Sequence, residues 1–411
     1  MKSSLLLSLA LGVSWILSPE SLVIAGNISG QTGWLTFPSL IGVVILYVLC
    51  NQLLRTEGLP PAPGREFLIL QHGGGSITAT TLCLAACLPL TVLAGTALLV
   101  TAGYTLNEVF LYWFPNFGFS FLLLALLTIL QLLRKEYGLW LQVCFVGLAM
   151  GGLLTLSLFG VFSPDKPASE ILRQSTGFSF SSASLLLLLF VGHGSSLEQK
   201  ARPFPLALTT GFIIFFLWIL ASLGHVSPEK LATSTIPYMT AARKILGEPG
   251  RQLMGVVIIF GTCGALNGLM ILTRNIVDTL SREKTVPAFL SSKKQRWVLP
   301  FFLSAAIGTC MATGLAGDEL LELLLRSALI LWLLYYSLLC LSAVYWVQKV
   351  SAAIPYLSLF CTLLLIAACI TLVVGDPHRL QMSIFIFSVL FAGGLLSTCW
   401  YFIMRHHKHA P

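Results

Sequence analysis

Apolar segments long enough to cross a membrane recur along the whole chain, and they limit its fold more than any other feature. A helix that crosses the hydrocarbon core of a bilayer needs roughly 20 apolar residues. Each such segment must be helical, because lipid cannot satisfy free backbone N–H and C=O groups. We expect about twelve spans: Leu5–Gly26, Phe37–Leu54, Leu82–Gly103, Phe119–Leu133, Leu139–Phe162, Ala183–Leu197, Leu206–Leu223, Leu253–Leu280, Val298–Ala316, Leu321–Val347, Ile354–Val374 and Met382–Met404.

The composition agrees with a polytopic membrane protein. Of the 411 residues, 56% are hydrophobic and 10% are charged, and the mean hydropathy is +0.88. Soluble domains carry about 25% charged residues, so a disordered chain, a nucleic-acid-binding domain and an ordinary cytosolic enzyme are excluded. The net charge of +8 does not indicate a nucleic-acid partner, because the basic residues lie between the spans, where membrane topology requires them. The sequence predicts an all-α protein embedded in a lipid bilayer.

The distribution of basic residues predicts the orientation of the spans. With twelve spans and a cytoplasmic N-terminus, cytoplasmic segments hold fifteen of the 24 Lys and Arg residues, outer segments hold seven, and Arg274 and Arg326 lie within spans. Cytoplasmic loops are enriched in Lys and Arg. We therefore predict that both termini are cytoplasmic and that the protein resides in the plasma (inner) membrane.

No residue pattern indicates an enzyme, a cofactor or a metal site. The ten cysteines lie in apolar runs without a C-x-x-C spacing, and we expect them to be buried thiols. The tail Arg405–His409 contains three histidines, but we expect a solvated basic segment that anchors the end of the last span rather than a metal site. No nucleophile–base set and no phosphate-binding loop is present, so we predict a protein that is not an enzyme, without a cofactor or bound metal.

The first span is interrupted by Ser18-Pro19-Glu20-Ser21, which has the pattern of a helix start. Ser18 suits the N-cap, Pro19 the first helical position and Glu20 the first turn. We expect two half-helices here, with a proline kink as the alternative. Because a charge inside a span is costly, Glu20 is a candidate for binding a substrate ammonium, a coupling cation or a proton. The alternative is a capping residue that faces an aqueous vestibule.

The sixth span is interrupted by Gly192-His193-Gly194-Ser195, directly after Val191. Two glycines weaken a helix and expose its backbone. The alternative, that the span ends here, leaves the segment 183–191 too short to cross the membrane. His193 is a candidate pH sensor or hydrogen-bond donor to a substrate, or else a structural histidine.

The two interruptions fall in the first and sixth spans, which are equivalent positions in two halves of five spans. This pattern indicates a transporter built from inverted repeats, whose substrate lies between interrupted helices. We predict a first repeat over 1–162, a second over 163–347, and two further spans with a cytoplasmic tail over 348–411. The predicted substrate-binding residues are Ser18, Pro19, Glu20, Ser21, Val191, Gly192, His193, Gly194 and Ser195.

Three stretches resemble the amino acid–polyamine–organocation (APC) superfamily of transporters. In Asn267–Phe289, an apolar helix runs into Arg274, a short basic loop and then Pro287, as in the family's eighth helix. Phe190–Pro205 resembles the sixth helix with its acidic-basic-proline loop, and Ile236–Gly247 resembles the loop before the eighth helix. The resemblance covers nearly the whole chain and implies the inverted-repeat fold of the leucine-transporter type, with the last two spans as an addition.

The chain departs from the family at its first interruption. The family usually has a glycine-rich stretch whose amides hold the substrate carboxylate, whereas Pro19 removes one amide here and Glu20 adds an anion.

Thr262 and Asn267 are candidates for the site wall or a sodium position. Arg274 and Asp278, one turn apart, are expected to pair, either as structure or as a cytoplasmic gate.

The resemblance implies a secondary transporter for an amino acid or a related amine, working by alternating access and coupled to protons or sodium. A polyamine or organic-cation carrier of the same fold, favoured by Glu20, is one alternative. A receptor-like member that does not transport is another, and it would be favoured if bulky side chains filled the cavity. Arg326, expected near Asp318, Glu319 and Glu322, is either an outer gate or an interfacial arginine.

Overall fold

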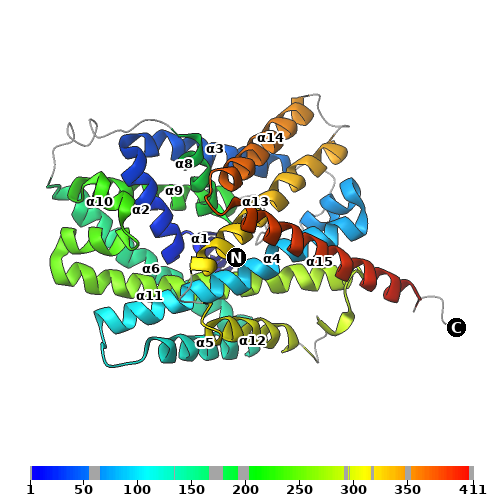
Figure 1. The fold of residues 1–411 in the computed structure, drawn as a ribbon, viewed down its shortest axis with the longest axis horizontal. Coiled ribbons are helices and arrows are strands. Elements are labelled where there is room, and N and C mark those ends of the chain that lie inside the picture. Colours follow the sequence, from blue (N-terminus) through cyan, green and yellow to red (C-terminus); the bar gives the residue numbers. More distant parts are fainter. Residues whose placement is uncertain are drawn as a thin grey trace. The chain divides into compact units, whose positions relative to one another are not determined.

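The computed structural model describes residues 2–54, 65–133, 135–165, 179–192, 203–290, 295, 297–315, 319–347 and 353–406, and all regular structure within these ranges is helical (Figure 1). Eight helical segments of this part are long and apolar enough to cross a membrane. Three shorter apolar helices, Asn116–Leu132, Phe180–Phe190 and Val298–Ala312, accompany them. The predicted all-α membrane fold is confirmed.

The chain divides into two compact units. The first comprises Met1–Ile45, Leu98–His193 and Arg202–Gly268, and the second comprises Leu46–Ala97, Gly194–Ala201 and Leu269–Pro411. Three long helices contribute to both units: α3 (Thr36–Leu54), α4 (Arg65–Val109) and α11 (Pro237–Arg282).

The first unit is built around the N-terminal helices. Here α6 packs against α9, and α1 packs against both, while α2 contacts α8, α9 and α10 (Figure 1). The helices that lie wholly in this unit are α1 (Lys2–Val13), α2 (Pro19–Thr32), η1 (Gly33–Leu35), α5 (Asn116–Leu132), α6 (Lys135–Phe162), α8 (Phe180–Leu186), η2 (Leu187–Phe190), α9 (Pro203–His225) and α10 (Pro228–Thr233).

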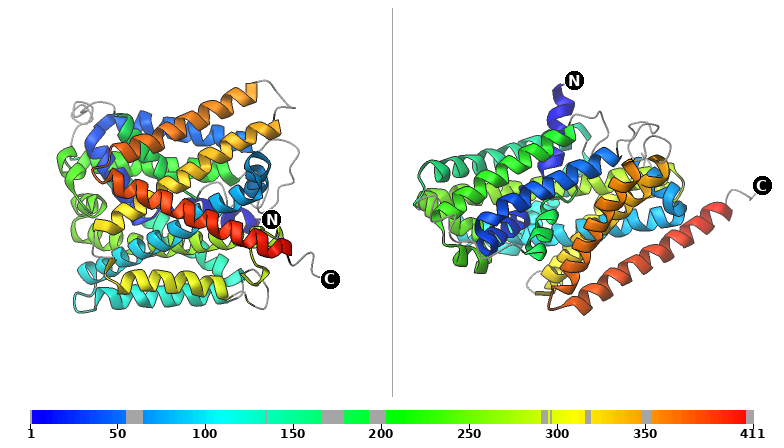
Figure 2. Two further views of the ribbon diagram at one scale, coloured as in Figure 1. Left: turned by 45° about the vertical axis from the view of Figure 1, so that its right-hand side comes forward. Right: turned by 90° about the horizontal axis from the view of Figure 1, so that it is seen from above.

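The second unit contains the C-terminal helices. The helix α13 packs along α14 and also contacts α15, as both views of Figure 2 show. The helices that lie wholly in this unit are η3 (Ala288–Leu290), α12 (Val298–Ala312), α13 (Glu319–Val347), α14 (Ala353–Val374) and α15 (Arg379–His406).

Each of the twelve predicted spans overlaps with helix in the described residues, but the third predicted span begins too late. Its helix, α4, starts at Arg65 rather than at Leu82. Of the three glycines that follow His72, only Gly75 leaves the helical region, with φ 83° and ψ 167°. Neighbouring packing therefore overrides the low helix propensity of the other glycines. A second break falls at Gly247 of α11 (φ 66°), the last residue of the stretch that resembles the loop before the family's eighth helix.

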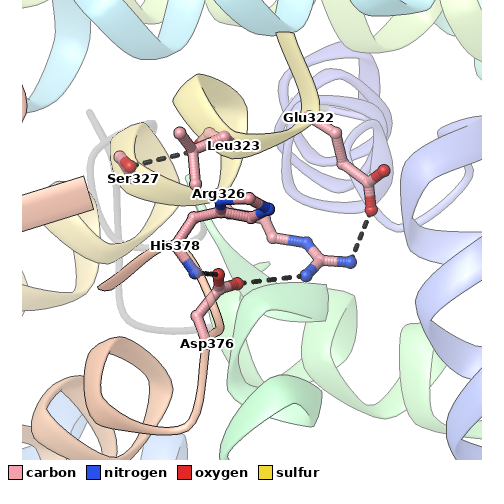
Figure 3. A network of polar contacts seen from close by, with 6 residues as sticks. All are labelled: Glu322, Leu323, Arg326, Ser327, Asp376 and His378. Carbon is pink, nitrogen blue, oxygen red and sulfur yellow. Dashed lines mark hydrogen bonds and ion pairs between the residues drawn. The ribbon is translucent and has the colours of Figure 1, made fainter. Parts of the chain in front are cut away.

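Arg326 joins two segments of the second unit (Figure 3). Its guanidinium group donates to Glu322 of the same helix and, at 3.4 Å, to Asp376 in the turn between α14 and α15. The Asp376 side chain is only 9% exposed, and its other oxygen accepts a 2.8 Å bond from the backbone N–H of His378. The predicted neighbour Glu322 is confirmed, and Asp376 was not foreseen.

Candidate functional site

The first span is interrupted a few residues earlier than predicted. The helix α1 ends at Val13, residues 14–18 form turns, and α2 begins at Pro19, so Glu20 and Ser21 are already helical. A proline ring clashes with the carbonyl four residues before it, which is that of Trp15 here, and this clash unwinds the segment ahead of Pro19. The carbonyl of Trp15 accepts bonds from the backbone N–H of Ser18 (2.9 Å) and from Ser21 Oγ (2.9 Å).

The start of α2 has the capping geometry that the sequence indicates. Ser18 has extended backbone angles (φ −70°, ψ 151°), and its Oγ accepts a 3.2 Å bond from the backbone N–H of Ser21. Pro19 occupies the first turn together with Glu20. The predicted helix start within the span is confirmed.

The sixth span is interrupted as well. After α8 the chain tightens into the 3-10 helix η2, Val191 is extended (φ −61°, ψ 144°), and Gly192 has a φ of 80°. Only glycine adopts such a φ readily, so the helix cannot continue through this position. The predicted residues His193, Gly194 and Ser195 lie outside the described part of the chain.

A hydrogen bond joins the two interruptions. The indole Nε1 of Trp15 donates to the backbone carbonyl of Leu188 over 2.9 Å. Trp15 and Leu188 are buried, as are Leu17 and Phe190 around them. Residues from two helix breaks thus meet within the first unit, at the position that the inverted-repeat hypothesis assigns to a substrate.

Glycines on one face of α11 allow it to approach this region closely. A Cβ atom added at Gly261 would lie 2.3 Å from the carbonyl oxygen of Leu17, and one at Gly268 would lie 2.6 Å from Ser14 Oγ. Gly261 and Gly268 are seven residues apart and therefore share a helix face. Any side chain at Gly261 would push α11 away from the interrupted span.

Asn267 belongs to a buried amide cluster. Its Oδ1 accepts a 2.6 Å bond from Gln131 Nε2, and its Nδ2 donates to Gln142 Oε1 at 2.7 Å. Gln142 Nε2 in turn donates to the carbonyl of Gly264 at 3.0 Å. These bonds join α5, α6 and α11. The amide oxygen and the amide nitrogen of Asn267 thus both bond to neighbouring helices. Thr262, also on α11, donates a hydrogen bond to the carbonyl of Leu98 at 3.3 Å.

The helix α2 has a polar face and a closely packed face. Asn27 and Gln31 follow Glu20 by seven and eleven residues, so the three lie on one side. On this side Ser182 of α8 donates a 3.4 Å bond to Gln31. On the other side, a Cβ at Gly30 would lie 2.3 Å from the backbone nitrogen of Ala232, which leaves no room for a side chain.

Glu20 is half-buried and lies within electrostatic reach of the buried Tyr238 hydroxyl. The candidate gate residues Arg274 and Asp278 lie on the part of α11 that belongs to the second unit. Ser18, Glu20 and Gly192 therefore belong to the same unit, whereas Arg274 and Asp278 belong to the other.

Sequence reasoning missed three residues of this region. Trp15 was counted as part of an apolar run, although a Trp N–H at membrane depth needs an acceptor. Gln131 and Gln142 are lone amides inside apolar spans, which is the signal that could have identified them.

A family model described as amino acid permease matches residues 8–396. The chain belongs to the amino acid permease family. Its permease fold agrees with the predicted APC superfamily membership, and the family identifies it as a membrane transporter rather than an enzyme. No curated protein sequence matches the chain significantly.

Solved structures similar to this permease include the manganese transporter of Eremococcus coleocola in complex with an aromatic bis-isothiourea compound. The two chains are 12% identical, with a TM-score of 0.62 over 98% of this chain and 95% of that chain. Two mutants of the same transporter give 13% identity, the same coverage and the same TM-score. At this identity the likeness shows the fold alone, and that fold is the transporter fold expected for an integral membrane permease.

Proposed function

We propose that this chain is a secondary active transporter that moves an amino acid or a related amine across the membrane by alternating access. The hydrogen bond between Trp15 and Leu188 carries the proposal, because it joins the interruptions of two helices. Helix ends at membrane depth offer N–H groups to carboxylates and C=O groups to cations. An amino acid presents both a carboxylate and an ammonium group.

The proposed site extends over both interruptions. Its floor is the glycine face of α11, where Thr262 and Asn267 support the wall. The gate assigned to Arg274 and Asp278 stays a prediction, because both residues lie in the second unit. The substrate-binding residues are Ser18, Pro19, Glu20, Ser21, Val191, Gly192, His193, Gly194 and Ser195.

The orientation and the coupling ion belong to the same proposal. The charge distribution supports cytoplasmic termini in the plasma (inner) membrane. The predicted repeats, 1–162 and 163–347, would exchange access to the site between its two sides, driven by a proton or sodium gradient.

Glu20 favours an amine among the possible substrates. Its carboxylate lies in the first turn of α2 and opposes a bare carboxylate ligand. A polyamine or organic-cation carrier is therefore a second candidate. The similar structures are of a manganese transporter, but in the described part of this chain no group of three or more His, Cys, Asp and Glu is arranged for a metal ion. We therefore favour an organic cation over a metal as substrate.

The packing around the breaks supports a further candidate, a receptor-like member without transport. Trp15 is 3% exposed and Phe190 is fully buried, so bulky side chains fill the junction. In a transporter, the same packing corresponds to a closed conformation that must open.

Uptake of radiolabelled amino acids and amines into proteoliposomes, with and without proton and sodium gradients, tests the proposal. We expect accumulation of at least one amino acid or amine. Binding of a ligand without any flux would instead establish the receptor-like candidate, and uptake of polyamines alone would establish the second.

A matched pair of variants tests the role of Glu20. The sequence Ser227-Pro228-Glu229 repeats the same helix start at α10, where Glu229 is exposed. Glu20→Gln should change substrate preference or uptake strongly, whereas Glu229→Gln should not. Helix capping alone contributes about 0.3–1 kcal/mol, so equal behaviour of the two variants would assign Glu20 a capping role only.

A further inference from the structure

A carboxyl group in the second unit lies in a setting that the proposed transport site does not use. Glu66 stands in the first turn of α4 and is half-buried. Its Oε2 accepts a 2.8 Å hydrogen bond from the hydroxyl of Tyr335, which is 2% exposed. Within the described residues, no lysine, arginine or histidine forms an ion pair with Glu66. A carboxylate held without a counter-charge beside apolar helices favours binding of a cation.

Small polar groups continue from this pair along α4. Cys83, Cys87 and Thr91 are spaced four residues apart and share one helix face. Cys83 lies within electrostatic reach of Tyr335, and Cys87 lies close to Thr273. Thr273 and Thr91 are joined by a 2.7 Å bond between their hydroxyls. These side chains are all buried. A row of buried polar side chains therefore extends from Glu66 along α4.

Next to the pair lies an unsatisfied hydroxyl. Tyr336 is 3% exposed, and among the described residues its hydroxyl has no hydrogen-bond partner. Glu66, Tyr47, Cys50 and Cys340 lie within electrostatic reach of it. A buried polar atom without a partner is costly. The Tyr336 hydroxyl is therefore suited to a neighbour, such as a protonated carboxyl group, that can donate a hydrogen bond to it in one protonation state.

The chemistry of the surrounding groups selects the cation. The titratable groups that face Glu66 are Cys83 on α4 and Tyr335 and Tyr336 on α13. Hard metal cations require several oxygen ligands, whereas these neighbours supply one thiol and two phenol groups. In the part of the chain that the structure describes, no metal-binding cluster is present. A proton needs only the carboxylate.

We propose that Glu66 and Tyr335 form a proton-binding site through which a proton gradient drives this transporter. This inference rests on the proposed transport function. Binding converts the carboxylate and one proton into a carboxylic acid, which becomes a donor as well as an acceptor. The residues before Gly75 form a separate helical segment that lies against Ser342 of α13 at Gly73. Protonation therefore changes the bonding between this segment and α13.

Infrared spectroscopy of the purified protein in lipid tests the site without transport. One component of the carboxylic-acid absorption that titrates with pH should be present in the natural protein and lost in Glu66→Gln, while the components of the other carboxyl groups remain. Glu108→Gln is the matched control, because Glu108 is exposed at the other end of the same helix. Tyr335→Phe should keep the band but shift its titration. A band unchanged in Glu66→Gln would overturn the inference, and Tyr335→Phe decides the matter if Glu66→Gln does not fold.

Transport adds a second readout. A gradient of one pH unit can support about tenfold accumulation of a substrate that moves with one proton. We expect this stimulation in the natural protein and in Glu108→Gln, and its loss in Glu66→Gln. Stimulation by sodium but not by protons would refute a proton as occupant. If the natural protein exchanges no amino acid or amine in the absence of a gradient, the proposed function fails, while the infrared result still tests the site.

Discussion

The indole Nε1 of Trp15 donates a 2.9 Å hydrogen bond to the main-chain oxygen of Leu188, across 173 positions of sequence. The bond satisfies one of the carbonyls that the tightening of helix into η2 would otherwise leave open. It also places the interruption of the first span beside that of the sixth. In the proposed transport cycle, opening of the site would break this bond.

Replacement of Trp15 by Phe tests the bond while it keeps an aromatic ring. The carbonyl of Leu188 would lose its partner in a buried place, which costs about 1–3 kcal/mol. We expect a lower melting temperature in detergent and a changed rate of substrate exchange. Trp34→Phe serves as the control, because Trp34 is 40% exposed, and a similar loss in both variants would contradict the assigned role.

Gly30→Ala tests the close contact of α2 with α10. The new methyl group would meet the backbone of Ala232, and such overpacking costs about 1–3 kcal/mol. Gly42→Ala is the matched control, since nothing lies within 4 Å of its Cβ position. There the higher helix propensity of Ala should stabilise α3 by up to about 1 kcal/mol. Thermal unfolding of the two variants should therefore shift in opposite directions.

Asn267→Ala tests the amide cluster. The substitution leaves the amides of Gln131 and Gln142 without their partner, and a buried unsatisfied group costs about 1–3 kcal/mol. Gln252→Ala, at an exposed position of the same helix, should have little effect. An Asn267→Ala protein as stable as the natural one, yet with altered sodium dependence, would favour the predicted ion-site role over the structural one.

Asp376→Asn tests the junction drawn in Figure 3. The Asp376 carboxylate is mostly buried between Arg326 and the N–H of His378, and bonds to such a charged group contribute about 1.5–3 kcal/mol. Glu322→Gln alters the other partner of Arg326, and the Glu322 side chain is 66% exposed. Exposed pairs contribute about 0–1 kcal/mol, so only Asp376→Asn should lower the unfolding temperature clearly.

The proposed topology predicts which introduced cysteines react from outside. A cysteine at Tyr112, which is 86% exposed in the loop after α4, should react with a reagent that does not cross the membrane. A cysteine at the exposed position Glu283, after α11, should react only after permeabilisation. The same labelling of the natural protein measures the background from its own cysteines. The reverse pattern would invert the assigned orientation.

Local chemistry explains what the sequence could predict. Ser18 and Pro19 define a helix start by themselves, because the cap and the missing N–H act within one turn. The break was misplaced by a few residues because the proline acts backwards, on the carbonyl of Trp15. Gly192 was recognised for a similar local reason, because glycine weakens a helix and exposes its backbone.

Partners distant in sequence could not be predicted. Gln142 is visible as a lone amide in an apolar span, but nothing in its neighbourhood identifies Asn267 as its partner. The same holds for Glu66 and Tyr335, which are 269 positions apart. Such pairs depend on how the spans pack, and a repeating apolar pattern specifies that each span is helical without specifying its neighbours.

The glycines of α2 have a mechanical consequence. A Cβ at Gly26 would lie 2.6 Å from the ring of Pro237, and one at Gly30 would lie 2.3 Å from the backbone nitrogen of Ala232 in α10. No space is left between α2 and the segment from α10 to Pro237 at either point. We therefore expect any tilt of α2 during transport to displace this segment as well, so that the loop between α9 and α11 follows the movement of the half-helix.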